Sequence, residues 1–135
     1  MRLIDMHCDT IFELFRRGNM NFKNNTLGVD LKKLKDAESM AQFFACFIYM
    51  KMFQGEERFS KGYRYALDMI SFAKKEFEKY PNEIMLVKSY EELLQNEKVG
   101  KISAFLTAPF SCFQAILKGF VRISSMICRI SFMRK

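Results

Sequence analysis

Two hydrophobic periodicities alternate along residues 1–107 of this chain. Short apolar stretches bounded by polar residues are typical of buried strands, and they occur at residues 2–7, 40–50, 83–89 and 101–107. Between them, the pattern is typical of helices, which are predicted at residues 11–18, 29–39, 56–80 and 89–98. The Asn-rich residues 19–28 are predicted to form a loop.

Capping residues mark the predicted helix ends. Thr10 is predicted to cap the first helix, with Glu13 three residues later at the capping-box position. Gly18 is the expected C-terminal stop of that helix. The last helix has the same N-terminal signature, with Ser89 followed three residues later by Glu92.

The order of these elements predicts an α/β fold. Strands that alternate with helices imply right-handed crossovers and a largely parallel sheet. An open doubly wound sheet and a closed (β/α)₈ barrel both fit the alternation. A complete barrel needs about 250 residues, so a chain of 135 residues holds at most part of one.

The net charge of +7 is unevenly distributed. Residues 1–107 contain 17 Lys and Arg against 15 Asp and Glu, whereas residues 108–135 contain 5 basic residues and no acid. No nucleic-acid-binding fold accompanies the basic end, so nucleic acid is not an expected partner. No stretch resembles a membrane span or a secretory signal, which makes a cytoplasmic location the expectation.

Four cysteines are far apart and form no C-x-x-C pair: Cys8, Cys46, Cys112 and Cys128. This spacing does not favour a cysteine zinc knuckle or a redox motif. We expect mostly buried free thiols.

The single histidine of the chain lies at the end of the first predicted strand. His7 precedes Asp9 by two residues, so both side chains are expected to face the same way. In parallel α/β folds, sites form at this end of the strands. Imidazole and carboxylate suit zinc, but catalytic zinc usually takes three protein ligands. The pair by itself is therefore either part of a metal site or a structural hydrogen-bonded pair beside a helix cap.

Three stretches together resemble one known family. They are "IDMHCDT" at residues 4–10, "VDLKKLKDAESMAQFFACFIY" at residues 29–49 and "GKISAFLT" at residues 100–107. Their order and spacing resemble the N-terminal third of the zinc-dependent membrane (renal-type) dipeptidases, peptidase family M19. The resemblance covers residues 1–107 and implies a partial (β/α)₈ TIM-type barrel that contains only the first strands and helices.

The resemblance also implies an activity. The complete family site holds two Zn²⁺ ions at the barrel mouth, where a metal-activated hydroxide hydrolyses a dipeptide substrate. His7 and Asp9 match the pair that binds the first metal, so only a half-site of ligands is present. Asp5, Cys8 and Thr10 are expected to serve strand packing, ligand support and helix capping. A homodimer of the family type is compatible with the resemblance.

The family pattern stops close to Thr107. Pro109 occupies the position of the family's metal-bridging glutamate, no acid follows it, and the chain has no second histidine. We therefore expect little or no dipeptidase activity from the chain alone. The alternative function is that of a non-catalytic truncated relic or a small interaction protein.

Residues 108–135 have two interpretations. One is a frameshift: a DNA stretch that encodes "AILKG" (GCG-ATA-TTG-AAA-GGC) gives "DIER" in another frame, similar to a "GDIERL"-like helix of family members. The other is a genuine cationic amphipathic helix, because the apolar positions at helical spacing are Ile116, Phe120, Ile123, Ile127 and Ile130. Such a helix is expected to cover a sheet edge or bind a partner, and contact with an anionic membrane surface is the lesser expectation.

Overall fold

The computed structural model describes residues 2–108. The prediction of a basic C-terminal helix at residues 108–135 lies almost entirely outside them. The described elements are, in order, β1 (Leu3–Cys8), α1 (Thr10–Arg17), α2 (Leu31–Asp36), β2 (Ser39–Ala45), the 3₁₀ helix η1 (Met50–Met52), α3 (Arg58–Phe77), β3 (Ile84–Leu86), α4 (Tyr90–Lys98) and β4 (Ile102–Thr107). The strands and helices predicted within this range are confirmed, and most of their ends shift by one to three residues. The strand predicted at residues 40–50 is too long, because β2 ends at Ala45 and η1 begins at Met50.

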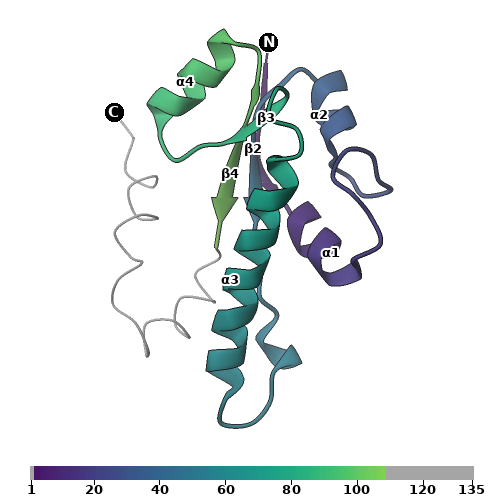
Figure 1. The fold of residues 1–135 in the computed structure, drawn as a ribbon, viewed down its shortest axis with the longest axis vertical. Coiled ribbons are helices and arrows are strands. Elements are labelled where there is room, and N and C mark those ends of the chain that lie inside the picture. The colour runs from purple at the N-terminus through teal and green to yellow at the C-terminus, as the bar shows by residue number, and fades with distance from the viewer. Residues whose placement is uncertain (1, 109–135) are drawn as a thin grey trace.

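The strands form one parallel sheet in the order β1-β2-β4-β3, which confirms the predicted α/β fold with a parallel sheet. β1, β2 and β4 follow one another as neighbouring strands of a barrel do. β3 is a short additional strand on the outer side of β4 (Figure 1). After β2, the chain skips the adjacent position and forms β3 at the edge of the sheet. It then returns to form β4 between β2 and β3.

This reversal decides which helix covers which face. A right-handed crossover that runs backwards along a sheet places its helix on the opposite face. Accordingly, α1, α2 and α3 pack against one face, which we term the helix-covered face, with Phe22, Phe44 and Phe77 in mutual ring contact at its centre. α4 lies on the other side of the sheet (Figure 1).

The face opposite to the helix-covered face, termed the second face, carries Ala41, Phe43 and Phe105. Phe43 and Phe105 stack with their ring centroids 4.5 Å apart, and Leu93 of α4 packs into the same small cluster. Asn96 of α4 donates a hydrogen bond to the Ser103 hydroxyl over 3.2 Å. α4 is thus fixed to the sheet by one buried polar contact as well as by apolar packing.

Two of the predicted helix ends are confirmed. Gly18 ends α1 in the left-handed conformation (φ 67°), and its N–H donates to Leu14 O. The Ser89 hydroxyl accepts the N–H of Glu92 over 3.2 Å at the start of α4. No helix among residues 2–108 is both long and apolar enough to cross a bilayer.

The predicted cap of α1 is wrong. Thr10 is the first residue of the helix, and its hydroxyl donates to Val29 O over 3.0 Å, which ties α1 to the following loop. Asp9 holds the N-cap position, but its side chain makes no capping hydrogen bond. Glu13 forms ion pairs with Arg16 and Arg17 in place of a capping box.

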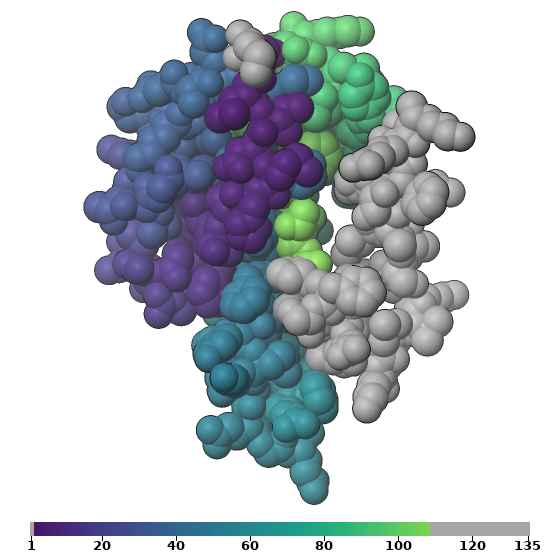
Figure 2. Space-filling view, turned by 180° about the vertical axis from the view of Figure 1, so that it is seen from behind, coloured from purple at the N-terminus to yellow at the C-terminus, as the bar shows by residue number. Residues whose placement is uncertain are grey.

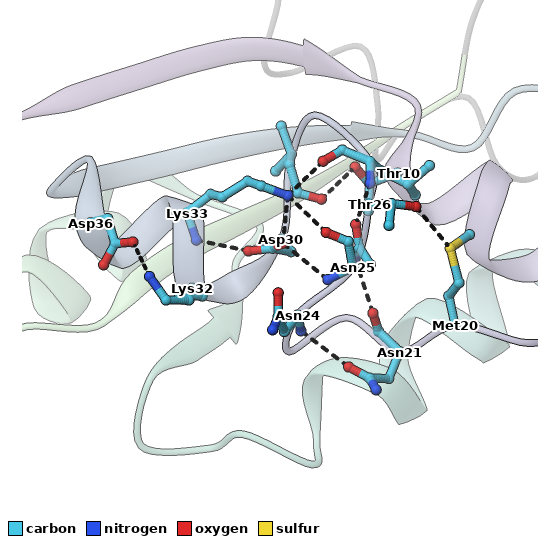
Figure 3. Close-up of polar contacts among 12 residues, drawn as sticks. Thr10, Met20, Asn21, Asn24, Asn25, Thr26, Asp30, Lys32, Lys33 and Asp36 are labelled. Atoms are coloured by element: carbon cyan, nitrogen blue, oxygen red, sulfur yellow. Dashed lines mark hydrogen bonds and ion pairs between the residues drawn. The ribbon is translucent and has the colours of Figure 1, made fainter.

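One buried carboxylate organises the loop between α1 and α2 (Figure 3). Asp30 is fully buried. Its Oδ1 accepts the Lys33 N–H over 2.8 Å, and its Oδ2 accepts the Asn25 N–H over 3.1 Å and the Lys33 ammonium over 2.7 Å. The same ammonium donates to Asn25 O and Leu27 O. Asp30 therefore caps α2 and closes the loop with a single side chain.

A second buried carboxylate connects this loop to α3. Glu76 is buried, and its Oε1 accepts the N–H of Phe22 over 3.0 Å. Its Oε2 pairs with the ammonium of Lys79. This contact holds the loop backbone where the Phe22 ring enters the core.

The Asp30 network makes a prediction about stability. Burial raises the pKa of Asp30, but hydrogen bonds from Lys33 and Asn25 outweigh it and hold the pKa below its ordinary value. Asp30→Ala is expected to lower the free energy of unfolding by about 2 kcal/mol or more at pH 7. The contribution is complete above the unfolded pKa of about 4 and is lost as pH falls through the lower folded pKa. Urea unfolding followed by circular dichroism between pH 3 and 7 measures the difference.

The matched control is Asp36→Ala, on the same helix. Asp36 is exposed and forms an ion pair with Lys32, so its loss is expected to cost less than about 0.5 kcal/mol. Equal destabilisation by the two variants would contradict the assigned role of Asp30.

A second stability prediction concerns Glu38, which follows α2 with a φ of 51°. An L-residue with a side chain is strained in this left-handed region, whereas glycine is not. Glu38→Gly is expected to raise the unfolding free energy by about 0.5–1 kcal/mol. Glu38→Ala, which keeps the Cβ atom, is the control and is expected to give no such gain. A lower midpoint for Glu38→Gly than for Glu38→Ala in urea unfolding would refute this account.

Candidate metal centre

The structure brings the two predicted metal ligands together at the C-terminal end of β1. His7 is the penultimate residue of the strand, and Asp9 follows its last residue. His7 Nε2 lies 3.4 Å from Asp9 Oδ1, and the two side chains are 64% and 57% exposed. The pair is therefore accessible to a ligand from solvent.

A β-bulge sets the direction of these side chains. Asp5 lies opposite Gln42 and Cys8 lies opposite Phe44, so three steps along β1 match two along β2. Cys8 packs into the core on the helix-covered face. Because neighbouring strand residues face opposite sides, His7 is directed to the second face.

Without the extra residue in β1, His7 and Asp9 would point to the helix-covered face. Asp5 shares its register position with Gln42, on the same side of β2 as Phe44. Regular alternation from Asp5 would place His7 and Asp9 on that side as well, under the helices. The bulge is a feature that the sequence analysis missed, since the "DMHCD" pattern alternates without any visible interruption.

Two polar contacts hold the backbone at the bulge. The N–H of His7 donates to Asp5 Oδ1 over 3.2 Å. The buried side chain of Gln42 reaches across from β2, and its Nε2 donates to Asp5 O over 3.5 Å and to Phe43 O over 3.2 Å. Asp5 is thus engaged through its carboxylate and through its carbonyl.

Cys8 lies between the two candidate ligands in sequence but not in space. It is buried on the opposite face, and burial raises the pKa of its thiol to about 11. Its thiol therefore packs in the core, on the other face of the sheet from His7. As predicted, Cys8 and Cys46 are both buried, while Cys112 and Cys128 lie outside the described residues.

The carboxylate of Asp9 is not used by the adjacent helix. Its side chain makes no capping hydrogen bond to α1, although the positive end of the helix dipole lies beside it. The Asp9 carboxylate is therefore not engaged in a cap, and it lies 3.4 Å from His7.

The separation of the two donor atoms fits a shared divalent ion. Two ligands about 2.1 Å from one zinc ion, at the tetrahedral angle, lie about 3.4 Å apart. The His7–Asp9 distance has this value. Among residues 2–108, however, no three His, Cys, Asp or Glu side chains gather as a metal cluster would require. The described part of the chain therefore brings two candidate ligands together, fewer than the three protein ligands that a catalytic zinc usually takes.

Comparison with known proteins identifies a family whose sequence model this chain matches. The sequence model of the membrane dipeptidases, peptidase family M19, matches residues 1–109. Among curated protein sequences, none matches this chain significantly.

Three solved structures resemble the fold. Dipeptidase AC, a metallopeptidase of family M19, has a TM-score of 0.67 at 19% identity over 80% of this chain and 35% of its own. A metallopeptidase from Rhodobacter sphaeroides, bound to a phosphinate mimic of the dipeptide L-Ala-D-Ala, has a TM-score of 0.65 at 17% identity over 80% and 38%. The probable dipeptidase PvdM from Pseudomonas aeruginosa has a TM-score of 0.59 at 15% identity over 73% and 30%.

The sequence identity of these structures to the chain is only 15–19%, so their similarity shows the fold alone. The chain spans about a third of their length. The family match, in contrast, covers most of the sequence and includes both His7 and Asp9. The chain therefore belongs to the membrane dipeptidase family, peptidase family M19.

Proposed function

We propose that residues 1–107 are the N-terminal third of a zinc-dependent dipeptidase barrel and that His7 and Asp9 bind its first metal ion. The observation that carries the proposal is the 3.4 Å approach of His7 Nε2 to Asp9 Oδ1 at the end of a parallel strand. Sites of barrel enzymes form at this end of their strands. The family match over the same residues supports the assignment.

In this proposal, His7 and Asp9 hold the metal ion and orient it. The imidazole of His7 offers Nε2, and Asp9 offers a carboxylate oxygen with the negative charge that offsets part of a divalent cation. When bound, the metal supplies Lewis-acid polarisation of the scissile carbonyl and lowers the pKa of the attacking water. More than half of each ligand side chain is exposed, which leaves room for the remaining ligands and for a dipeptide.

The chain does not complete this chemistry by itself. The sequence has one histidine and no Asp or Glu beyond Glu97. Two protein ligands fall short of the three that a catalytic zinc usually takes. We therefore expect the 135-residue chain to bind a divalent metal weakly and to leave dipeptides intact.

This expectation is tested on the purified chain with Co²⁺ as the probe and L-Ala-D-Ala as the assay dipeptide. Binding of Co²⁺, followed by visible absorption, is expected in the wild type and is expected to be lost in His7→Ala and Asp9→Asn. Asp36→Asn, a change at an exposed aspartate on α2, is the matched control and is expected to bind like the wild type. No dipeptide hydrolysis above background is expected in the metal-loaded wild type.

Either of two results would contradict the proposal. Binding that survives in His7→Ala and Asp9→Asn would place the metal elsewhere. Hydrolysis by the wild type that disappears in His7→Ala would show that the chain assembles a complete site.

A second candidate function is a non-catalytic interaction protein. The observation that favours it is the exposed apolar surface of β1, where Leu3, Ile4 and Met6 are 48%, 46% and 66% exposed. Seen from behind, the purple N-terminal residues lie open at the surface (Figure 2). Absence of any Co²⁺ binding in the experiment above would favour this function over the dipeptidase one.

The DNA beyond the codon of Thr107 tests how far the family relation extends. If residues 108–135 result from a frameshift, another frame is expected to encode a glutamate directly after β4. Two histidines and about 200 further residues are then expected downstream, enough to complete a barrel. Sequencing this region in all three frames decides the question, because a tail with no such frame is genuine.

A further inference from the structure

Backbone groups at the bulge in β1 need hydrogen-bond partners outside the regular strand pairing. An extra residue in one strand disturbs the ladder and leaves backbone groups that need another partner. The N–H of His7 lies in this irregular stretch and donates to the carboxylate of Asp5, two residues earlier, over 3.2 Å. The side chain of Asp5 thus supplies an acceptor where the strand deviates from regular pairing.

The other side of the bulge is held from the neighbouring strand. Gln42 on β2 is buried, and its Nε2 is 3.5 Å from Asp5 O and 3.2 Å from Phe43 O. The carbonyl and the carboxylate of Asp5 therefore both make polar contacts, one toward β2 and one toward His7. The backbone of residues 5–7 is fixed between them.

The direction of His7 depends on this arrangement. Cys8 is anchored in the core of the helix-covered face, and the extra residue before it is what sends His7 and Asp9 to the second face. A bulge that frays would leave His7 without a fixed direction. The 3.4 Å approach of His7 Nε2 to Asp9 Oδ1 would then be lost.

We propose that Asp5 is a positioning residue for the metal half-site: its carboxylate accepts the His7 N–H and so maintains the β-bulge that aims His7 and Asp9 together at the second face. The inference rests on the proposed function for the metal, but the state of the bulge can be measured without one. Asp5 itself is not a ligand in this arrangement.

The experiment uses the complete 135-residue chain and three variants. Asp5→Ala removes the acceptor, Asp5→Asn keeps an acceptor oxygen without the charge, and Asp36→Ala removes an exposed aspartate elsewhere. Amide hydrogen exchange of His7, measured by NMR in metal-free protein, reports on the bulge. Titration with Co²⁺, followed by visible absorption, reports on the half-site.

The expected pattern is rescue by asparagine. His7 amide exchange is expected to be about tenfold faster in Asp5→Ala, because the amide loses its acceptor. Co²⁺ affinity is expected to fall about tenfold or more in the same variant, as for other groups that orient metal ligands. Asp5→Asn and Asp36→Ala are expected to stay close to the wild type in both measurements.

Other results overturn the inference in distinguishable ways. If the wild type binds Co²⁺ and Asp5→Ala binds it equally well, Asp5 does not position the site. If Asp5→Asn loses as much affinity as Asp5→Ala, the charge matters and the hydrogen bond does not. If the wild type binds no Co²⁺ but the exchange pattern holds, the proposed metal function has failed while the role of Asp5 in the bulge stands.

A further variant covers the case in which Asp5→Ala does not fold, which far-UV circular dichroism detects. Asp5→Glu keeps the charge but moves the carboxylate by one methylene. It is expected to show faster His7 exchange and weaker Co²⁺ binding than Asp5→Asn. The reverse order would overturn the inference.

Discussion

Two parallel strands can be joined only by a connection that crosses one face of their sheet, and the handedness of that crossover selects the face. In this molecule the three crossovers place their helices on opposite faces of the sheet. The forward crossovers from β1 to β2 and from β2 toward β3 place α1, α2 and α3 on the helix-covered face. The backward crossover from β3 to β4 places α4 on the second face. Beside β1 the second face carries exposed Ile4 and Met6, and it is there that the bulge directs His7.

Two buried carboxylates explain how a loop of polar composition joins a compact core. Burying an ionised group is costly unless it is paired and hydrogen-bonded. Asp30 meets this condition with Lys33 and two backbone N–H groups, and Glu76 meets it with Lys79 and the N–H of Phe22. Their partners lie on the loop, on the start of α2 and on the end of α3. The Asn-rich loop is therefore held in one conformation by Asp30 and Glu76, whose burial requires these partners.

Much of the fold follows from the sequence because its signals are local. Gly18 and Ser89 mark helix ends through their own backbone and side-chain chemistry, and both predictions are confirmed. Thr10 was assigned to a cap by the same reasoning, wrongly, because a hydroxyl that can accept from its own helix can equally donate to Val29 O across the fold. The edge position of β3 also escapes prediction, since a crossover from β2 can reach either place in the sheet without a change in local pattern.

The candidate site, like the fold, is predictable from local sequence signals only in part. The pairing of His7 with Asp9 follows from their spacing, whereas the face they occupy does not. That face depends on a register shift relative to Gln42 and Phe44, which are more than thirty residues away in the sequence. The sequence places Asp5 beside the candidate ligands without a specific role for it; the structure adds the hydrogen bond from the His7 N–H to its carboxylate.

The same irregularity has a second physical consequence for β1. This strand lies at one edge of the described sheet, and an edge strand with exposed apolar residues invites pairing with another chain. A bulge twists such an edge away from regular pairing, and the N–H of His7 already donates to the side chain of Asp5. One local distortion thus directs the candidate ligands and makes the strand beneath them a poorer template for aggregation.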